Sequence, residues 1–227
     1  MEKQNPIIEL DLYLIRHGES QGNVGYGRDD LTLKESYDPV LTENGISQAQ
    51  AAGRHLADID FDAFYASGLL RAVRTASEIM NGQKEKKSLN ILPELTEVGV
   101  RPEYSGVDIE EIREFCPTAK LADGVDASLP LVCYSSNDDE LDIFERAERV
   151  VEYLRERYKN GEKVAAVSHA AFITFIVFGI MGFKGNMPTF DISFYNTGIT
   201  RIIFYKEGTN KYGDIVFEYI NDTTHLK

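Results

Sequence analysis

Residues 12–20 constrain this chain most, because an apolar run ends there in a basic pair and a glycine. Residues 10–15 are short, apolar and followed by a glycine turn, which is typical of a buried strand in a parallel sheet. Arg16 and His17 therefore stand where such a strand ends. Ligands of open α/β sheets bind at the carboxyl ends of the strands, so we expect the chemistry of the chain at this edge.

Strand-like and helix-like patterns alternate along the chain, which is the order typical of an α/β fold. We expect a three-layer α/β/α sandwich with a mostly parallel central sheet and a small inserted cap. The predicted strands cover residues 10–15, 61–66, 88–92, 163–167, 192–195, 199–205 and 215–220. The predicted helices cover residues 43–57 with Thr42 as N-cap, 69–80, 109–115, 140–158 and 170–180.

The length of the chain favours one large domain. A chain of 227 residues can bury a sizeable core, so we expect a single domain over residues 1–227. Residues 99–139 begin with several prolines and glycines and are only weakly periodic, so we interpret them as a cap inserted over the site. Residues 22–39 contain glycines, aspartates and a proline with little periodicity, which predicts a long loop.

Composition narrows the choice of partner and compartment. The formal net charge of −13 disfavours nucleic acid and anionic membranes as partners, so a phosphate site would be a local positive pocket. The most apolar stretch, residues 170–183, is shorter than the about 20 residues that a membrane-spanning helix needs. Cys116 and Cys133 lack a metal-type spacing, and the N-terminal residues do not fit a signal peptide. We therefore expect two reduced thiols in a cytoplasmic protein.

The pair formed by Arg16 and His17 favours phosphoryl chemistry. A guanidinium is a planar, permanently charged fork that suits a phosphoryl group, and it holds an adjacent imidazole in the neutral, nucleophilic form. Gly18 allows backbone N–H groups to approach an anion closely. Taken alone, His17 fits a structural role as well as a catalytic one, and the neighbouring arginine shifts the balance toward catalysis.

Three further strand ends carry candidate groups. Arg71 lies in the opening turns of a predicted helix, where a cation opposes the helix dipole unless an anion binds; Arg74 fits a solvated or ion-paired residue better. His169 follows the strand predicted at residues 163–167. Glu97 follows the strand predicted at residues 88–92, and Glu94 is an alternative carboxylate. The remaining histidines, His55 and His225, are expected to be exposed.

Five sequence blocks carry a family resemblance. Residues 14–20 with Asn23 match R-H-G-E-[ST]-x-x-N, residues 41–49 match L-T-x-x-G-x-x-Q-A, and residues 67–76 match S-x-L-x-R-A-x-x-T-A. Residues 95–97 are similar to an L-x-E element, and residues 167–169 to a V-S-H element. In this order the blocks resemble those of the histidine phosphatase superfamily, also called the phosphoglycerate mutase-like family, and specifically its phosphatase branch.

The resemblance implies a metal-independent phosphomonoesterase that acts on a small phosphorylated metabolite through a phosphohistidine, without a cofactor. His17 would attack phosphorus, and Glu97 would be the general acid and then the general base. Positive groups would stabilise the charge on the equatorial oxygens. The residues implied to bind these oxygens are Arg16, Asn23, Arg71 and His169. The resemblance leaves the substrate and the oligomeric state open.

Some positions depart from the family pattern and keep alternatives open. Gly68 stands where a proline is common, and Ala170 and Ala171 replace a pair of glycines. A cofactor-dependent phosphoglycerate mutase is one alternative, although the chain has no tryptophan and residues 96–99 differ from the E-R-x-Y-G motif of that enzyme. A non-catalytic phospho-ligand-binding module is another. The candidate contacts for the leaving group are Tyr26, Arg28, Tyr37, Arg101, Tyr104 and Arg113.

Overall fold

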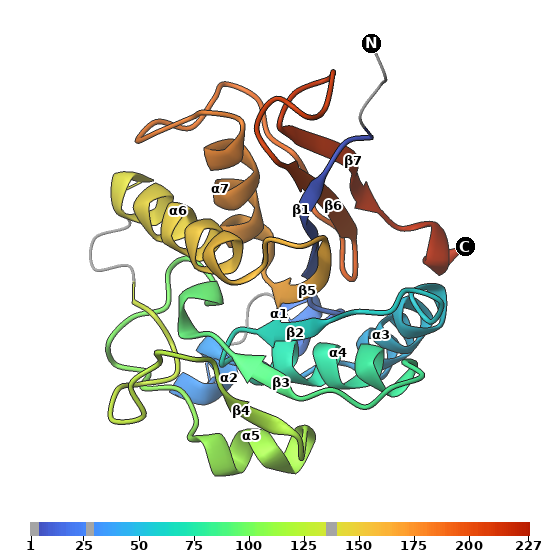
Figure 1. Cartoon of the computed structure of the whole chain (residues 1–227). Helices are drawn as coiled ribbons and strands as arrows, with labels where there is room; N and C mark the ends of the chain where they lie inside the picture. The colour runs from blue at the N-terminus through green and yellow to red at the C-terminus, as the bar shows by residue number, and fades with distance from the viewer. Residues whose placement is uncertain (1–4, 26–29, 135–139) are drawn as a thin grey trace.

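The structure is a computed structural model that describes residues 5–25, 30–134 and 140–227. Its centre is a seven-stranded sheet with the strand order β4-β3-β2-β5-β1-β6-β7 (Figure 1). Neighbouring strands from β4 to β1 pair in parallel, and only the β1–β6 and β6–β7 pairs are antiparallel. The strands are β1 Ile8–Arg16, β2 Ala63–Ala66, β3 Leu89–Ile91, β4 Ala119–Leu121, β5 Glu162–Ser168, β6 Ile199–Tyr205 and β7 Ile215–Asp222.

Helices cover both faces of this sheet, as Figure 1 shows. Side chains alternate along β1, so Leu12 and Leu14 pack with the apolar faces of α6 and α7. Tyr13 and Ile15 point to the other face and pack with α3, α4 and α5. The mostly parallel three-layer α/β/α arrangement predicted from the sequence is therefore confirmed. The helices are α3 Glu43–His55, α4 Leu70–Asn81, α5 Ile109–Phe115, α6 Glu140–Arg157 and α7 Ala170–Ile180.

Two predicted segments differ in the structure. The prediction of a strand at residues 192–195 is wrong. Backbone groups there bond to side chains instead of a neighbouring strand, since the carbonyl oxygen of Phe194 accepts from Arg16 and the N–H of Tyr195 donates to Asn221. The long loop predicted at residues 22–39 contains two short helices, α1 Gln21–Val24 and α2 Leu33–Tyr37. Thr32 caps α2 by accepting from the Glu35 N–H, so a local capping box forms helix without apolar periodicity.

The segment predicted as a cap is partly built into the sheet. The helix predicted at residues 109–115 forms α5, but β4 pairs in parallel with β3 and extends the sheet edge. Nearby, Val100, Tyr104 and Val132 form a small apolar cluster with Leu69 at the start of α4. These contacts join the segment to the body of the protein beside the candidate site. The division into one domain with a cap at residues 99–139 stays a prediction.

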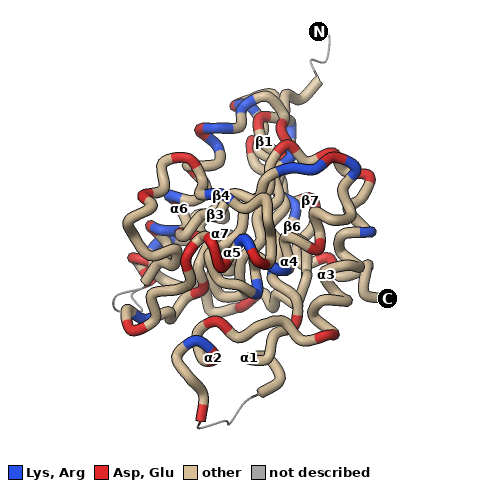
Figure 2. The backbone as a smooth tube through the Cα atoms, turned by 90° about the horizontal axis from the view of Figure 1, so that it is seen from below, with Lys and Arg blue, Asp and Glu red and all other residues tan. Residues whose placement is uncertain are grey.

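Charged residues of both signs are interspersed over the tube seen from below in Figure 2, with acidic residues the more numerous in the chain. In the same view α1 and α2 lie at one edge of the molecule. Among the described residues no helix is both long and apolar enough to cross a membrane. Cys116 and Cys133 are free thiols.

Candidate active site

The carboxyl ends of three parallel strands place the candidate residues together. Arg16, the last residue of β1, is in register with Ser168, the last residue of β5, and the end of β2 adjoins β5 on the other side. The segments that follow these strands therefore meet at one edge of the sheet. His17 follows β1, Ser67 follows β2 and His169 follows β5, as the sequence predicts.

The ring of His17 is held in one orientation by its own turn. Nδ1 lies 2.7 Å from the carbonyl oxygen of Gly18, and only 4% of the residue is exposed. A carbonyl oxygen can only accept, so Nδ1 carries the proton and Nε2 carries the lone pair. Burial, followed by the charges of Arg71 and Arg16, lowers the pKa of His17 well below its usual range. His17 is thus a neutral imidazole with an unprotonated Nε2.

Arg71 at the start of α4 lies against this nitrogen. Its Nε donates to Nε2 of His17 at 3.3 Å, and its Nη1 donates to the carbonyl oxygen of Tyr37 at 2.9 Å. The side chain is almost fully buried, and its Nη1 is 3.5 Å from Oδ1 of Asp38. Burial lowers the pKa of Arg71, while the carboxylates of Asp38 and Glu97 act in the opposite direction. The guanidinium is therefore oriented by one acidic side chain and one carbonyl.

The side chain of Asp38 is fully buried and connects Arg71 to the backbone at the start of α4 and to Tyr104. Its Oδ2 accepts from the backbone N–H of Leu70, the first residue of α4, at 3.0 Å. The same oxygen accepts from the hydroxyl of Tyr104 at 3.1 Å. Burial raises the pKa of Asp38, and Arg71 opposes this effect. The carboxylate acts in place of a capping side chain at α4, because the N-cap residue Leu69 has none.

His169 occupies the N-cap position of α7 and faces His17. The two ring centroids are 5.1 Å apart, and His169 is fully buried. Its Nε2 lies 2.7 Å from the hydroxyl oxygen of Ser67. Burial, followed by the charge of Arg71, lowers the pKa of His169 well below its usual range. Its Nδ1 has no hydrogen-bond partner among the described residues, which leaves a buried polar atom available to a ligand.

Glu97 is bonded to the first turn of the same helix. Its Oε1 accepts from the backbone N–H groups of Phe172 at 3.0 Å and of Val98 at 2.9 Å, and the residue is half-buried. The competing carboxylate, Glu94, instead pairs with Arg149 on the outer side of α6, with 3.0 Å between Oε1 and Nε. Of the two carboxylates, Glu97 is the one that interacts with Arg71 and α7.

Comparison with known proteins identifies the family of the chain. The profile of the histidine phosphatase superfamily, branch 1, matches residues 12–213. The chain belongs to the histidine phosphatase superfamily. It is 32% identical over 115 residues to fructose-2,6-bisphosphatase TIGAR of Xenopus laevis, a match that covers 50% of this chain and 39% of that protein. It is 36% identical over 115 residues to a 2,3-bisphosphoglycerate-dependent phosphoglycerate mutase of Bartonella henselae, covering 47% and 50% of the two chains. The matched part thus spans at most about half of these curated relatives.

Solved structures extend the comparison over the whole fold. A phosphoserine phosphatase of Entamoeba histolytica, solved in complex with 3-phosphoglyceric acid, has a TM-score of 0.63 at 26% identity and covers 96% of this chain and 100% of its own. A phosphoglycerate mutase of Bacillus anthracis has a TM-score of 0.62 at 19% identity over 100% of this chain and 98% of its own. The second likeness concerns the fold alone.

The glycines in the blocks typical of the histidine phosphatase superfamily have a steric reason here. A Cβ atom on Gly18 would lie 2.4 Å from the carbonyl oxygen of Gly45, and one on Gly45 would lie 1.9 Å from that of Glu19. The turn after β1 and the start of α3 therefore touch backbone to backbone. Glu19 secures this contact by accepting from the Thr42 hydroxyl at 2.7 Å and from Asn44 at 3.1 Å.

The loop after α7 adds a residue that sequence reasoning missed. Nδ2 of Asn196 donates to the carbonyl oxygen of His17 at 3.1 Å and to Oδ1 of Asn23 at 3.2 Å. Arg16 is bonded to the same loop, because its Nη1 donates to the carbonyl oxygen of Phe194 at 2.6 Å. The next residue, Thr197, has a φ of 55° and donates its N–H to the carbonyl oxygen of Arg16 at 3.1 Å. No periodic pattern marks these contacts in the sequence.

The structure separates the remaining candidates. Arg74 pairs with Glu78 on α4, in agreement with the interpretation as an ion-paired residue. Tyr104 is buried against Asp38, so it supports Arg71, while Arg113 pairs with Glu110 on α5. Tyr26 and Arg28 lie outside the described residues.

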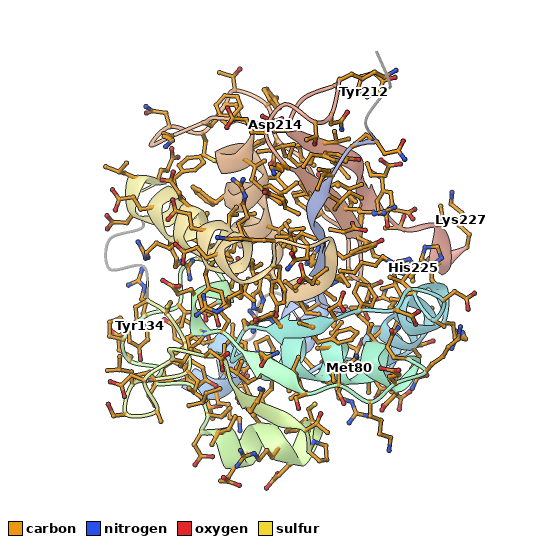
Figure 3. The ribbon with its side chains drawn as sticks, in the orientation of Figure 1. Met80, Tyr134, Tyr212, Asp214, His225 and Lys227 are labelled. Atoms are coloured by element: carbon orange, nitrogen blue, oxygen red, sulfur yellow. The ribbon has the colours of Figure 1, made fainter. Side chains whose placement is uncertain are left out.

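His225 is not exposed, which corrects the prediction for that residue. Figure 3 shows it beside α3, and its ring centroid lies 5.6 Å from that of His55. Its Nε2 is 2.9 Å from the hydroxyl oxygen of Thr197, and burial together with His55 lowers its pKa. The tail therefore packs under the Asn196 loop. His55 itself is exposed, as predicted.

A groove of about 450 Å³ lies between α6, α7 and β6, and is lined by Phe144, Val151, Ile180, Phe183 and Phe204, among others. It contains none of the candidate residues of the active site, so we do not assign the chemistry to it. Within residues 5–25, 30–134 and 140–227, no group of three or more histidine, cysteine or acidic side chains could hold a metal ion.

Proposed function

We propose that this member of the histidine phosphatase superfamily is a phosphomonoesterase that forms a phosphohistidine at His17. The observation that carries the proposal is the orientation of His17, whose Nδ1 is bonded to the Gly18 carbonyl oxygen at 2.7 Å. This bond leaves the Nε2 lone pair to attack phosphorus, and the low pKa of His17 keeps that lone pair available.

In the first step, Nε2 of His17 bonds to phosphorus as the bond from phosphorus to the leaving oxygen breaks. The non-bridging oxygens receive positive charge or hydrogen bonds from Arg16, Arg71 and the Nδ1 atom of His169. Asn23 is held near His17 by its hydrogen bond with Asn196. Such pre-oriented groups stabilise a transition state in which charge spreads over three equatorial oxygens.

Glu97 supplies the proton in this scheme. As a carboxylic acid it protonates the leaving oxygen, and the carboxylate that results then takes a proton from the water that attacks the phosphohistidine. The second step releases inorganic phosphate and restores both Glu97 and His17. The contact of Glu97 with the N-terminal turn of α7 supports this choice over Glu94.

The substrate is proposed only as a small phosphorylated metabolite. The similar proteins bear names that refer to fructose 2,6-bisphosphate, phosphoserine and phosphoglycerate. A panel of phosphorylated sugars, amino acids and glycerates would identify the preferred class.

The phosphoglycerate mutase alternative, supported by the 36% identity to the Bartonella enzyme, predicts rapid isomerisation of 3-phosphoglycerate in the presence of bisphosphoglycerate. The phosphatase proposal predicts slow dephosphorylation of both, and a binding module predicts no turnover.

The test uses para-nitrophenyl phosphate in the presence of a metal chelator. We expect the parent protein to release phosphate, and His17→Ala to release none. Mass spectrometry after a basic quench, in which phosphohistidine is stable, should find one added phosphoryl group on the peptide that contains His17. His55→Ala is the matched control, since His55 is exposed and lies outside the site. Unchanged hydrolysis by His17→Ala would contradict the proposal.

A further inference from the structure

Arg146 is a buried arginine on a helix whose other charges mostly face solvent. Only 4% of the residue is exposed, whereas its neighbour Arg149, one turn along α6, has more than half of its side chain exposed. An arginine is rarely buried in this way unless it is paired or bonded, because desolvation of a charge is costly. The position therefore calls for a role that the exposed charges of α6 do not have.

The contacts of Arg146 lie on both sides of Glu97. Its Nη1 donates to the carbonyl oxygen of Thr96 at 2.9 Å, and Thr96 directly precedes Glu97. Its guanidinium carbon lies 4.0 Å from the ring centroid of Phe172, and the N–H of Phe172 donates to Oε1 of Glu97. One planar cation thus contacts the residue that precedes Glu97 and one of the two residues whose N–H groups bond to its carboxylate.

The charge of Arg146 also interacts electrostatically with Glu97 in the candidate site. Burial lowers the pKa of Arg146, while Cys133 and then Glu97 favour its charged form. The second terminal nitrogen, Nη2, is buried and has no hydrogen-bond partner among the described residues. The cost of burying this charge is therefore offset in part by Cys133 and Glu97, so the arginine interacts electrostatically with the proposed acid.

We propose that Arg146 is a positioning residue that holds Glu97 in the orientation for proton transfer to the leaving oxygen. The inference rests on the proposed function of Glu97 as general acid. The proton passes from the Glu97 carboxyl group to the leaving oxygen while the bond from that oxygen to phosphorus breaks and the bond from Nε2 of His17 to phosphorus forms. Arg146 itself neither gives nor takes a proton in this step.

The test compares two aryl phosphates of similar shape whose leaving groups differ in how much they depend on protonation by a general acid. Para-nitrophenol is a good leaving group, whereas phenol, with a pKa of about 10 like that of tyrosine, departs readily only when it is protonated. We expect Arg146→Gln to lower kcat/KM for phenyl phosphate about tenfold more than kcat/KM for para-nitrophenyl phosphate, a part of the full effect of a general acid. Arg146→Lys keeps the charge and should restore part of the difference.

Arg149→Gln is the matched control. It removes the same charge from the next turn of the same helix and should leave the ratio of the two kcat/KM values unchanged. Glu97→Gln separates the two levels of the proposal: a loss specific to phenyl phosphate supports Glu97 as the acid, and equal losses for both substrates overturn the role of Glu97.

A specific loss in Glu97→Gln without one in the Arg146 variants overturns the role of Arg146 alone. Thermal unfolding of each variant identifies those that fold. If Arg146→Gln does not fold, Arg146→Lys decides the question through the ratio of kcat/KM for phenyl phosphate to kcat/KM for para-nitrophenyl phosphate. A ratio equal to that of the parent protein overturns the inference, and a lower ratio supports it.

Discussion

Asp38 and Arg71 form a buried ion pair in which Oδ1 of the carboxylate lies 3.5 Å from Nη1 of the guanidinium. Arg71 in turn donates from Nε to Nε2 of His17 at 3.3 Å. The acidic side chain therefore orients the cation that lies against the proposed nucleophile. The hydroxyl of Tyr104 donates to the other carboxylate oxygen of Asp38, Oδ2. A residue of the predicted cap therefore takes part in the same chain of contacts.

Asp38→Asn should disable this pair. Asparagine keeps an oxygen for the Leu70 N–H but has no negative charge to balance Arg71. Removing one partner of a buried ion pair destabilises a protein by about 3 kcal/mol, so we expect a loss of this size in urea unfolding. We also expect kcat/KM for para-nitrophenyl phosphate to fall at least about tenfold, because the guanidinium is no longer held beside His17.

Glu110→Gln is the comparison for that variant. It removes a carboxylate from the exposed pair with Arg113 on α5 and should change neither stability nor activity measurably. Similar stabilities of the two variants would argue against a structural role for the Asp38–Arg71 pair.

The pH dependence of stability should report the buried histidines. His17 and His169 have lowered pKa values in the folded protein, so below a pH of about 6.5 the unfolded chain binds protons that the folded chain excludes. The stability that they contribute is complete above this pH and is lost as the pH falls toward their folded pKa values. Urea unfolding should therefore give a smaller free energy of unfolding at about pH 5.5 than at about pH 7.5. His17→Asn should reduce the slope, and equal slopes would exclude this explanation.

Asn196→Ala should lower activity without unfolding the protein. The substitution removes two hydrogen bonds, to the His17 carbonyl oxygen and to Asn23. Each hydrogen bond contributes about 1 kcal/mol, so we expect the loss of both to lower kcat/KM by about thirtyfold at most as the turn that bears His17 loosens. Asn160→Ala, in an exposed turn before β5, is the control. If both variants keep the parent kcat/KM, Asn196 does not support the site.

Gly68→Ala should be strongly destabilising. A Cβ atom there would lie 1.9 Å from the carbonyl oxygen of Leu131, so the segment around Leu131 would have to move away from α4. Such a clash costs about 1–3 kcal/mol or more, measurable as a lower midpoint of thermal unfolding. Gly179→Ala in α7 is the control, because its Cβ would be 3.7 Å from Phe144 and alanine favours a helix. A stable Gly68→Ala variant would mean that this close approach is not required.

Much of the fold could be predicted because its signals are local. Apolar and small residues at helical spacing after the capping residue Thr42 predict α3, and the apolar run before Arg16 predicts β1. The parallel arrangement follows from the order of strands and helices. Strand β4 and helix α2 could not be predicted in this way, because three paired residues or one capped turn leave no periodic pattern.

In the candidate site, too, some residues could be predicted from local sequence blocks and others could not. The blocks around Arg16, His17, Arg71 and His169 are continuous in sequence, and the structure brings these residues to one edge of the sheet. The sequence predicts Glu97 as the acid with Glu94 as an alternative, and in the structure only Glu94 of these two forms an ion pair with Arg149.

The sequence by itself determined the class of fold, the family blocks and the residues that bear the proposed chemistry, because these depend on periodicity and on short fixed spacings. Only the tertiary structure decided how those residues are held. Asp38, Asn196 and Arg146 act through hydrogen bonds and charge contacts with residues far away in the chain. Such contacts depend on how separate elements pack, and a polar residue in a loop or on a helix carries no local sign of the partner that it will meet.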